Sequence, residues 1–366
     1  MVWRLSGLKL PLDHDDSDLR QAIQRRLNLP QGALQGHQVV KRSVDARDQA
    51  SIRVVYALDL ELALSGAAHQ RWLQRVRRDR ELRPASTERY HLPHHFDPGT
   101  APRPLVVGAG PCGYFAALLL AQMGLRPLLL ERGQPVRQRT ADTFRFWRQQ
   151  GPLLPDSNAQ FGEGGAGTFS DGKLYSQISE PQRYIRKVLE ELVAAGAQRE
   201  ILTEHRPHIG TFKLATVVRG LRGKIEALGG EVRFGARVDG LVIDTLEGKR
   251  QLRGVLMGDG SRIEAEWVVL AIGHSARDTF AMLDAHGVTL EAKAFAIGLR
   301  IEHPQALIDR ARWGGCAGHP RLGAAEYKLV RPASPDLRAV YSFCMCPGGL
   351  VVGAASEAGE IGRAHV

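Results

Sequence analysis

The sequence predicts an α/β protein built on a doubly wound parallel sheet, with a small α+β unit before the sheet and an antiparallel unit after it. Three observations support this fold class. Residues 104–133 run from an apolar strand through a glycine-rich turn into a helix and a second apolar strand. Residues 1–95 show strand and helix patterns of their own, and Val268–Gly273 is a continuous apolar run. A strand–helix–strand pattern is typical of a parallel βαβ unit.

The first 95 residues are expected to form the α+β unit. Alternating apolar residues predict strands, and a period near 3.6 predicts helices. The expected strands are Trp3–Leu10, Gln38–Val44 and Ser51–Leu62, and the expected helices are 15–26 and Ala67–Arg80. Asp15 or Ser17 can cap the first helix. Residues 96–103 contain proline and glycine and are expected to be a linker.

Residues 104–133 have the features needed to hold a dinucleotide. Gly108 permits a tight turn, and Gly110 lets the backbone approach a pyrophosphate. Gly113 lets the helix expected at 112–123 pack closely on the strand at 105–107. Glu131 follows the second strand, Leu128–Leu130, and can accept hydrogen bonds from both ribose hydroxyls. An ordinary glycine turn needs no acid at this spacing, so the acid favours a dinucleotide site over that alternative. An acid here also favours a ribose without a phosphate group, so the pattern indicates FAD or NAD rather than NADP.

The same domain is expected to continue to residue 282. Helices are predicted after Gly133, at 182–195 and at 214–228, and strands are predicted from Glu231 onward. Residues 253–267 alternate as a hairpin with its turn at 257–260. Val268–Gly273 is expected to be a strand buried on both faces.

Composition excludes several classes of protein. No apolar run in the 366 residues approaches the ~20 needed to cross a membrane, and four cysteines are too few for a disulfide framework. A cytoplasmic location is therefore predicted. The formal net charge is +10, and its densest run, Arg71–Arg83, predicts either a solvated, salt-bridged helix face or an anion-binding surface. His91, His94 and His95 lack nearby cysteine or carboxylate clusters, so no metal site is predicted.

Residues 229–273 resemble the second nucleotide-contacting portion of the glutathione-reductase-type FAD proteins. The strings at 161–174, 208–214, 270–280, 295–305 and 343–352 resemble a family of bacterial, largely uncharacterised FAD-dependent oxidoreductases with an N-terminal α+β domain. That resemblance implies FAD, with Val238 against the adenine and residues 269–273 near the flavin diphosphate. It also implies a substrate domain, here 283–359. Proteins of this type continue past Gly359, so residues 360–366 are predicted to be a non-native tail on a truncated chain.

The candidate site residues fall into two groups. The residues expected to contact the cofactor are Gly108, Ala109, Gly110, Pro111, Cys112, Gly113, Glu131, Arg132, Gly164, Gly165, Gly167, Thr168, Val238, Ala271 and Gly273. The candidate catalytic residues are Lys173, a cation for the reduced flavin or the phosphates, and His274, a possible acid or base. A surface lysine and a packed histidine are the alternatives. Cys344 and Cys346 offer a weaker redox hypothesis, and Cys112 is expected to pack as a small hydrophobic residue.

The predicted activity is FAD-dependent oxidoreduction, with hydride transfer between flavin and an organic substrate. No second glycine fingerprint follows a strand, so NAD(P)H or another electron partner would dock transiently. The alternative is an FAD-containing module that binds RNA or protein without turnover. The arginine-rich first domain motivates that alternative, although nucleic acid and membranes are not the expected partners.

Overall fold

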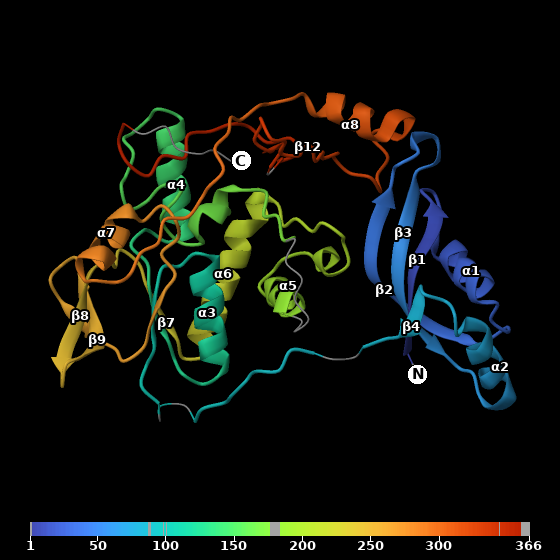
Figure 1. The fold of residues 1–366 in the computed structure, drawn as a ribbon, viewed down its shortest axis with the longest axis horizontal. Coiled ribbons are helices and arrows are strands. Elements are labelled where there is room, and N and C mark those ends of the chain that lie inside the picture. The colour runs from blue at the N-terminus through green and yellow to red at the C-terminus, as the bar shows by residue number, and fades with distance from the viewer. Residues whose placement is uncertain are drawn as a thin grey trace.

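The computed structural model describes residues 2–86, 89–97, 99, 101–175, 184–343 and 345–359. Its N-terminal unit is an antiparallel sheet of order β2-β3-β1-β4 with two helices (Figure 1). Its elements are β1 (Val2–Pro11), α1 (Asp16–Leu27), β2 (Leu34–Asp45), η1 (Gln49–Ser51), β3 (Arg53–Leu62), α2 (Gly66–Val76) and β4 (Leu82–Pro84). Asp15 caps α1 in a capping box with Asp18, which confirms the predicted start of that helix.

Helix α2 is shorter than the predicted 67–80 because the chain turns back into the sheet. Leu82 is buried and pairs with Leu5 of β1, so sheet pairing ends the helix at Val76. Residues far along the chain complete the hydrophobic core of this unit. Trp313 and Ala325 are buried in it, at and after α8 (Gln305–Trp313). The proposed domain boundaries stay a prediction, and the packing of α8 was not visible in the sequence.

The central sheet is parallel and has the order β11-β5-β6-β7. Its strands are β5 (Leu105–Val107), β6 (Leu128–Leu130), β7 (Glu231–Arg233) and β11 (Val268–Leu270). One face packs on α3 (Pro111–Gln122), α5 (Tyr184–Ala194) and α6 (Thr211–Ala227). The other face packs on the antiparallel sheet β8 (Val238–Leu246), β9 (Lys249–Met257) and β10 (Arg262–Glu264). The predicted α/β fold with a parallel sheet is confirmed.

Two sequence-based expectations about these strands need correction. Strand β11 lies at an edge of the sheet, and Leu270 is 39% exposed, so β11 is not buried on both faces. The predicted hairpin at 253–267 forms, but β9 also pairs with β8 through a turn at residues 247–248. The three strands together cover the sheet face that an uninterrupted βαβ pattern would cover with helices.

The remaining elements surround the carboxyl ends of the parallel strands or follow them. They are α4 (Val136–Trp147), η2 (Gly165–Phe169), η3 (Arg199–Leu202), α7 (Arg277–Ala285), η4 (Gly314–Cys316), β12 (Val330–Arg331) and β13 (Val340–Tyr341). The antiparallel pairing expected at 283–359 is limited, among the described residues, to β12 with β13 and an isolated bridge between Ser334 and Leu337. Residues 360–366 lie outside the described residues. Within the described chain no helix has the length and apolar character to span a bilayer.

Candidate functional site

The turn after β5 is held by close backbone contacts that only glycine allows. Gly108 has φ +102°, and a Cβ there would lie 2.4 Å from the carbonyl oxygen of Ala271. A Cβ on Gly113 would lie 1.7 Å from the carbonyl oxygen of Gly108. Gly110 differs, because the nearest atom to its Cβ position is the Cα of Gly165 at 3.9 Å. Space is therefore left at the N-terminus of α3, where N–H groups can bind phosphate.

The Glu131 carboxylate joins this turn to two neighbouring segments of the chain. Its side chain is 5% exposed, and its carboxylate accepts N–H hydrogen bonds from Ala109 (2.7 Å), Gly133 (2.9 Å) and Gly162 (3.0 Å). Three loops meet at one carboxylate. Of these three N–H groups, only that of Ala109 donates to Oε2, so Oε2 keeps a lone pair for a hydroxyl group. The contact with a ribose stays a prediction.

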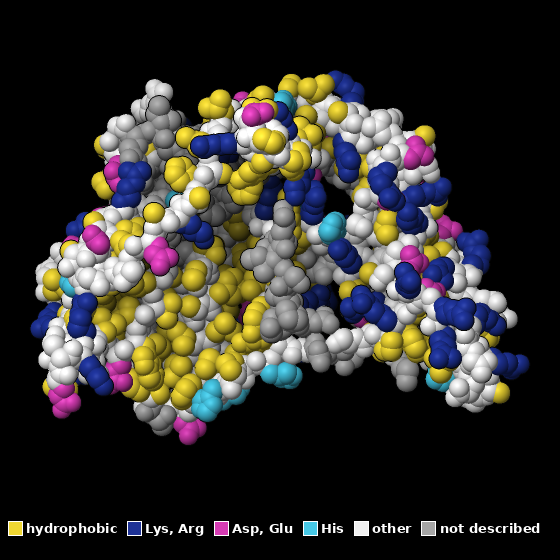
Figure 2. Space-filling model, in the orientation of Figure 1, with side chains coloured by type: hydrophobic (Ala, Val, Ile, Leu, Met, Phe, Trp, Pro, Cys, Tyr) yellow, Lys and Arg dark blue, Asp and Glu magenta, His cyan; other side chains and the backbone are white. Residues whose placement is uncertain are grey.

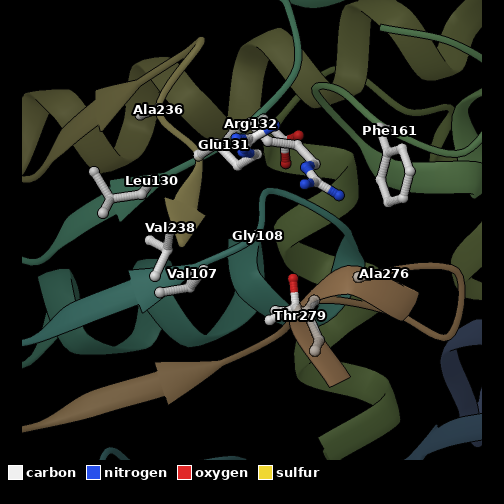
Figure 3. A pocket seen from close by; sticks show the side chains of 12 residues that line it. Val107, Gly108, Leu130, Glu131, Arg132, Phe161, Ala236, Val238, Ala276 and Thr279 are labelled. Atoms are coloured by element: carbon white, nitrogen blue, oxygen red, sulfur yellow. The ribbon is translucent and has the colours of Figure 1, made fainter. Parts of the chain in front are cut away.

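A small pocket opens beside Glu131 at the ends of β5 and β6 (Figure 3). It is lined by Val107, Gly108, Leu130, Glu131, Arg132, Phe161, Ala236, Arg237, Val238, Ile272, Ala276 and Thr279. The structure thus brings together Gly108, Glu131, Arg132 and Val238, which the sequence assigned to one ligand. Apolar walls with a few polar groups are typical of a nucleoside pocket.

Arg132 is fixed at the edge of this pocket by two carboxylates and a ring. It pairs with Asp156 at 3.1 Å and with Asp278, and its guanidinium lies 4.7 Å from the centroid of Phe161. The hydrogen bond from Arg132 lowers the pKa of the Asp278 carboxyl against the opposing effect of burial. Arg277, the neighbour of Asp278 in the sequence, pairs with Glu357 at 3.5 Å.

Arg139 of α4 is a buried arginine that supports the second glycine-rich segment, residues 162–173, which we call the glycine-rich loop. It is 0% exposed and donates from Nε to Asn158 (2.9 Å) and from Nη1 to the carbonyls of Glu163 (2.7 Å) and Gly165 (2.8 Å). Nη1 also lies 3.2 Å from the hydroxyl of Thr168, so that candidate side chain faces the loop interior. Burial lowers the pKa of Arg139 to about 10, against the opposing charges of nearby carboxylates, so it stays charged at neutral pH.

Glu163 ties the same loop to two helices. Its side chain is 0% exposed and accepts from the Tyr114 hydroxyl at 2.8 Å and from the Val136 N–H at 2.6 Å. Burial, with the Glu163 charge, raises the pKa of Tyr114. Sequence reasoning missed both Arg139 and Glu163. The one available signal is that Arg139 shares a helical stripe with Val136 and Thr143, which are also buried.

Lys173 lies in a cluster of titratable side chains beyond η2. Its Nζ is 3.7 Å from the Asp171 carboxylate, whose Oδ2 is 3.2 Å from Nδ1 of His208. The Cys346 side chain is a third neighbour of Asp171. Burial would raise the pKa of Asp171, but these three neighbours together lower it, so the carboxylate is ionised at neutral pH. The sequence indicated Lys173 and, as a weaker candidate, His208, but it did not indicate that both would contact Asp171.

The other candidates lie at the surface or outside the described residues. His274 is exposed, and its Nε2 lies 3.4 Å from the Ser275 hydroxyl. Gly273, before it, has φ +72°. Cys112 is exposed at the start of α3, so the expectation that it packs as a small hydrophobic residue was wrong. Cys344 lies outside the described residues. Among the described side chains, no three His, Cys, Asp or Glu residues are grouped to hold a metal.

Residues 103–279 match a family described as "FAD binding domain", and residues 294–362 match "FAD-dependent protein, C-terminal domain-like". The middle of the chain is therefore an FAD-binding domain, followed by a segment similar to the C-terminal domain of FAD-dependent proteins. FAD is the cofactor that the matched domain binds, which confirms the sequence-based choice over NAD. Residues 4–61 match a domain of unknown function.

One similar protein covers nearly the whole chain, and the similar solved structures cover about half of it. An uncharacterized protein of Clostridium beijerinckii is 41% identical over 367 residues, a match that covers 99% of this chain and 65% of the relative. Among solved structures, Thermovibrio ammonificans THI4 is 18% identical, with 51% of this chain and 64% of that chain covered and a TM-score of 0.36. The FAD-bound form of OTEMO is 16% identical over 49% of this chain and 26% of that chain, with a TM-score of 0.28. Likeness at this level indicates no substrate.

Proposed function

We propose that the chain is part of an FAD-dependent oxidoreductase that acts on a small organic substrate. The observation that carries this proposal is the convergence at Glu131, whose buried carboxylate joins the glycine turn, the pocket of Figure 3 and the glycine-rich loop. The site fits FAD because Gly110 leaves room at the helix N-terminus, and because the pocket has apolar walls. A dinucleotide needs a place for its diphosphate and a place for a nucleoside, and this site offers both.

The protein residues would position the cofactor and exclude water. Gly108, Gly110 and Gly165 would hold the diphosphate through the backbone, and Glu131 and Val238 would hold the adenosine end. FAD, when bound, supplies hydride exchange with the substrate. Arg139 keeps the glycine-rich loop in one conformation, and preorganised backbone donors need no rearrangement during reaction. A nicotinamide or another electron partner would dock transiently.

We place proton transfer on the Asp171–His208 pair. Asp171 orients Nδ1 of His208 at 3.2 Å, which leaves Nε2 to exchange a proton with a substrate. Lys173 supplies positive charge beside this pair. His274, exposed beside Gly273, is the second candidate for an acid or base.

Cofactor binding is tested by adding FAD to the purified chain, removing free ligand by desalting and recording the visible spectrum. We expect flavin absorption to stay with the protein in a one-to-one ratio. A chain that is folded by circular dichroism yet loses all flavin on desalting and shows no quenching of flavin fluorescence would contradict the proposal.

His208→Asn is expected to retain flavin but slow substrate-driven flavin bleaching about 100-fold, because the proton acceptor is lost. The matched control is His205→Asn, since His205 is exposed and lies three residues earlier. Stopped-flow absorbance on the flavin-loaded proteins, with substrates found by bleaching screens, measures the rate. Equal rates in His208→Asn and the unmodified protein would remove His208 from the reaction and leave FAD binding intact.

A further inference from the structure

A second pocket lies in the N-terminal unit, between the end of α1 and one face of α2. It has a volume of about 290 Å³. Its lining residues are Asn28, Leu29, Pro30, Ala68, Arg71, Trp72 and Arg75. We call it the α1–α2 pocket. Asn28 has φ +44° and ends α1, which turns the chain so that Leu29 and Pro30 form a wall opposite α2. None of the lining residues is acidic.

The arginines of α2 and its C-terminal extension are not neutralised by carboxylates. Arg71, Arg75, Arg77, Arg78 and Arg80 are exposed, and among the described residues none of them forms an ion pair. The two nearby acids, Asp79 and Glu81, both pair with Arg26 of α1 instead. Figure 2 shows Lys and Arg side chains gathered over this unit. The run at 71–83 is thus solvated, as one of the two sequence-based expectations has it, and its ion pairs are made by Asp79 and Glu81 with Arg26 and not by these arginines.

Trp72 is the buried member of the pocket lining. Its side chain is only 3% exposed and lines the α1–α2 pocket. Its indole Nε1–H is buried and has no acceptor among the described residues. A buried donor without a partner costs free energy, and proteins rarely keep one. Trp72 therefore belongs to the packed wall of the pocket, and Arg71 and Arg75 are its exposed charged groups.

We propose that the α1–α2 pocket binds the phosphate group of a small anionic ligand. Guanidinium groups match phosphate geometry in a bidentate manner, and Arg71 and Arg75 lie one helical turn apart on the pocket side of α2. Leu29, Pro30 and Ala68 provide an apolar wall for the organic part of the ligand. Trp72 is too buried to stack on a base, which favours a small phosphate compound over a nucleic-acid strand. The pocket is separate from the residues assigned to FAD.

The test is calorimetric titration of the full chain with inorganic pyrophosphate, in low salt and with saturating FAD so that the glycine turn is occupied. We expect one site per chain. Arg71→Ala with Arg75→Ala should weaken binding at least about tenfold, because two charge-assisted contacts are lost. Arg77→Ala with Arg78→Ala removes the same charge from exposed positions outside the pocket and should change affinity less than about twofold.

Further variants and probes separate the alternatives. Arg75 also donates to the Asn28 carbonyl at 3.2 Å, so the alanine pair could impair folding. In that case Arg71→Lys with Arg75→Lys keeps the charge and should still weaken pyrophosphate binding several-fold. Titration with a short single-stranded RNA identifies a general polyanion surface. The proposal would be overturned if pyrophosphate does not bind. It would also be overturned if the two double variants lose the same affinity, both for pyrophosphate and for RNA. Neither result would affect FAD retention.

Discussion

Gly113→Ala is expected to lower the free energy of unfolding by at least about 3 kcal/mol and to abolish FAD retention. The added Cβ would lie 1.7 Å from the carbonyl oxygen of Gly108, and that oxygen belongs to backbone, which cannot move as a side-chain end can. Helix α3 would have to shift away from β5, and the turn that receives the diphosphate would open. Urea unfolding followed by circular dichroism, together with flavin absorption after desalting, measures both effects.

Gly110→Ala is the matched comparison, three residues earlier in the same turn. Its backbone has φ −75°, and the nearest atom to its Cβ position is 3.9 Å away, so alanine fits sterically. We expect a loss of stability under about 1 kcal/mol, as for an N-cap glycine, but at least about tenfold weaker FAD binding, because the methyl group occupies the approach to the helix N-terminus. If Gly110→Ala binds FAD as tightly as the unmodified protein, the diphosphate does not lie where we place it.

The two glycines show which parts of the site the sequence could predict. Their roles depend on a local turn between one strand and one helix, and such turns recur with the same spacing. The cap of α1 by Asp15 is predictable for the same reason, since it involves residues only three positions apart. In each case the pattern contains all the partners of the interaction.

The parts that could not be predicted depend on partners far apart in the chain. Arg139 sits in a helix of low apolar content, and nothing local indicates that residues 158–168 will close over it. The Asp171–His208 pair forms because residues 171–174 lie beside 207–210, and Trp313 enters the N-terminal core from the other end of the chain. Burial of a polar side chain is a tertiary property, so hydropathy assigns it to the surface.

Arg139→Met is expected to destabilise the protein by about 4 kcal/mol or more and to eliminate FAD retention. Methionine has similar length and fills the buried space, so the effect isolates the lost donors. The carbonyls of Asn158 and Gly165 would lose their donor in a region that water does not reach, while the Glu163 carbonyl would keep only the Thr168 hydroxyl. Each unpaired acceptor costs on the order of 1–3 kcal/mol.

Arg137→Met on the same helix is the control, because Arg137 is exposed and the same charge is removed. Its stability should stay within about 0.5 kcal/mol of the unmodified protein, with flavin retained. Arg139→Lys keeps the charge, yet one ammonium on a flexible stem cannot reach from Asn158 to Gly165 at once, so it should recover only part of the stability. Full recovery by lysine would mean that charge alone is required. The argument for a fixed glycine-rich loop would then fail, because the loop would tolerate a cation that does not hold its carbonyls in place.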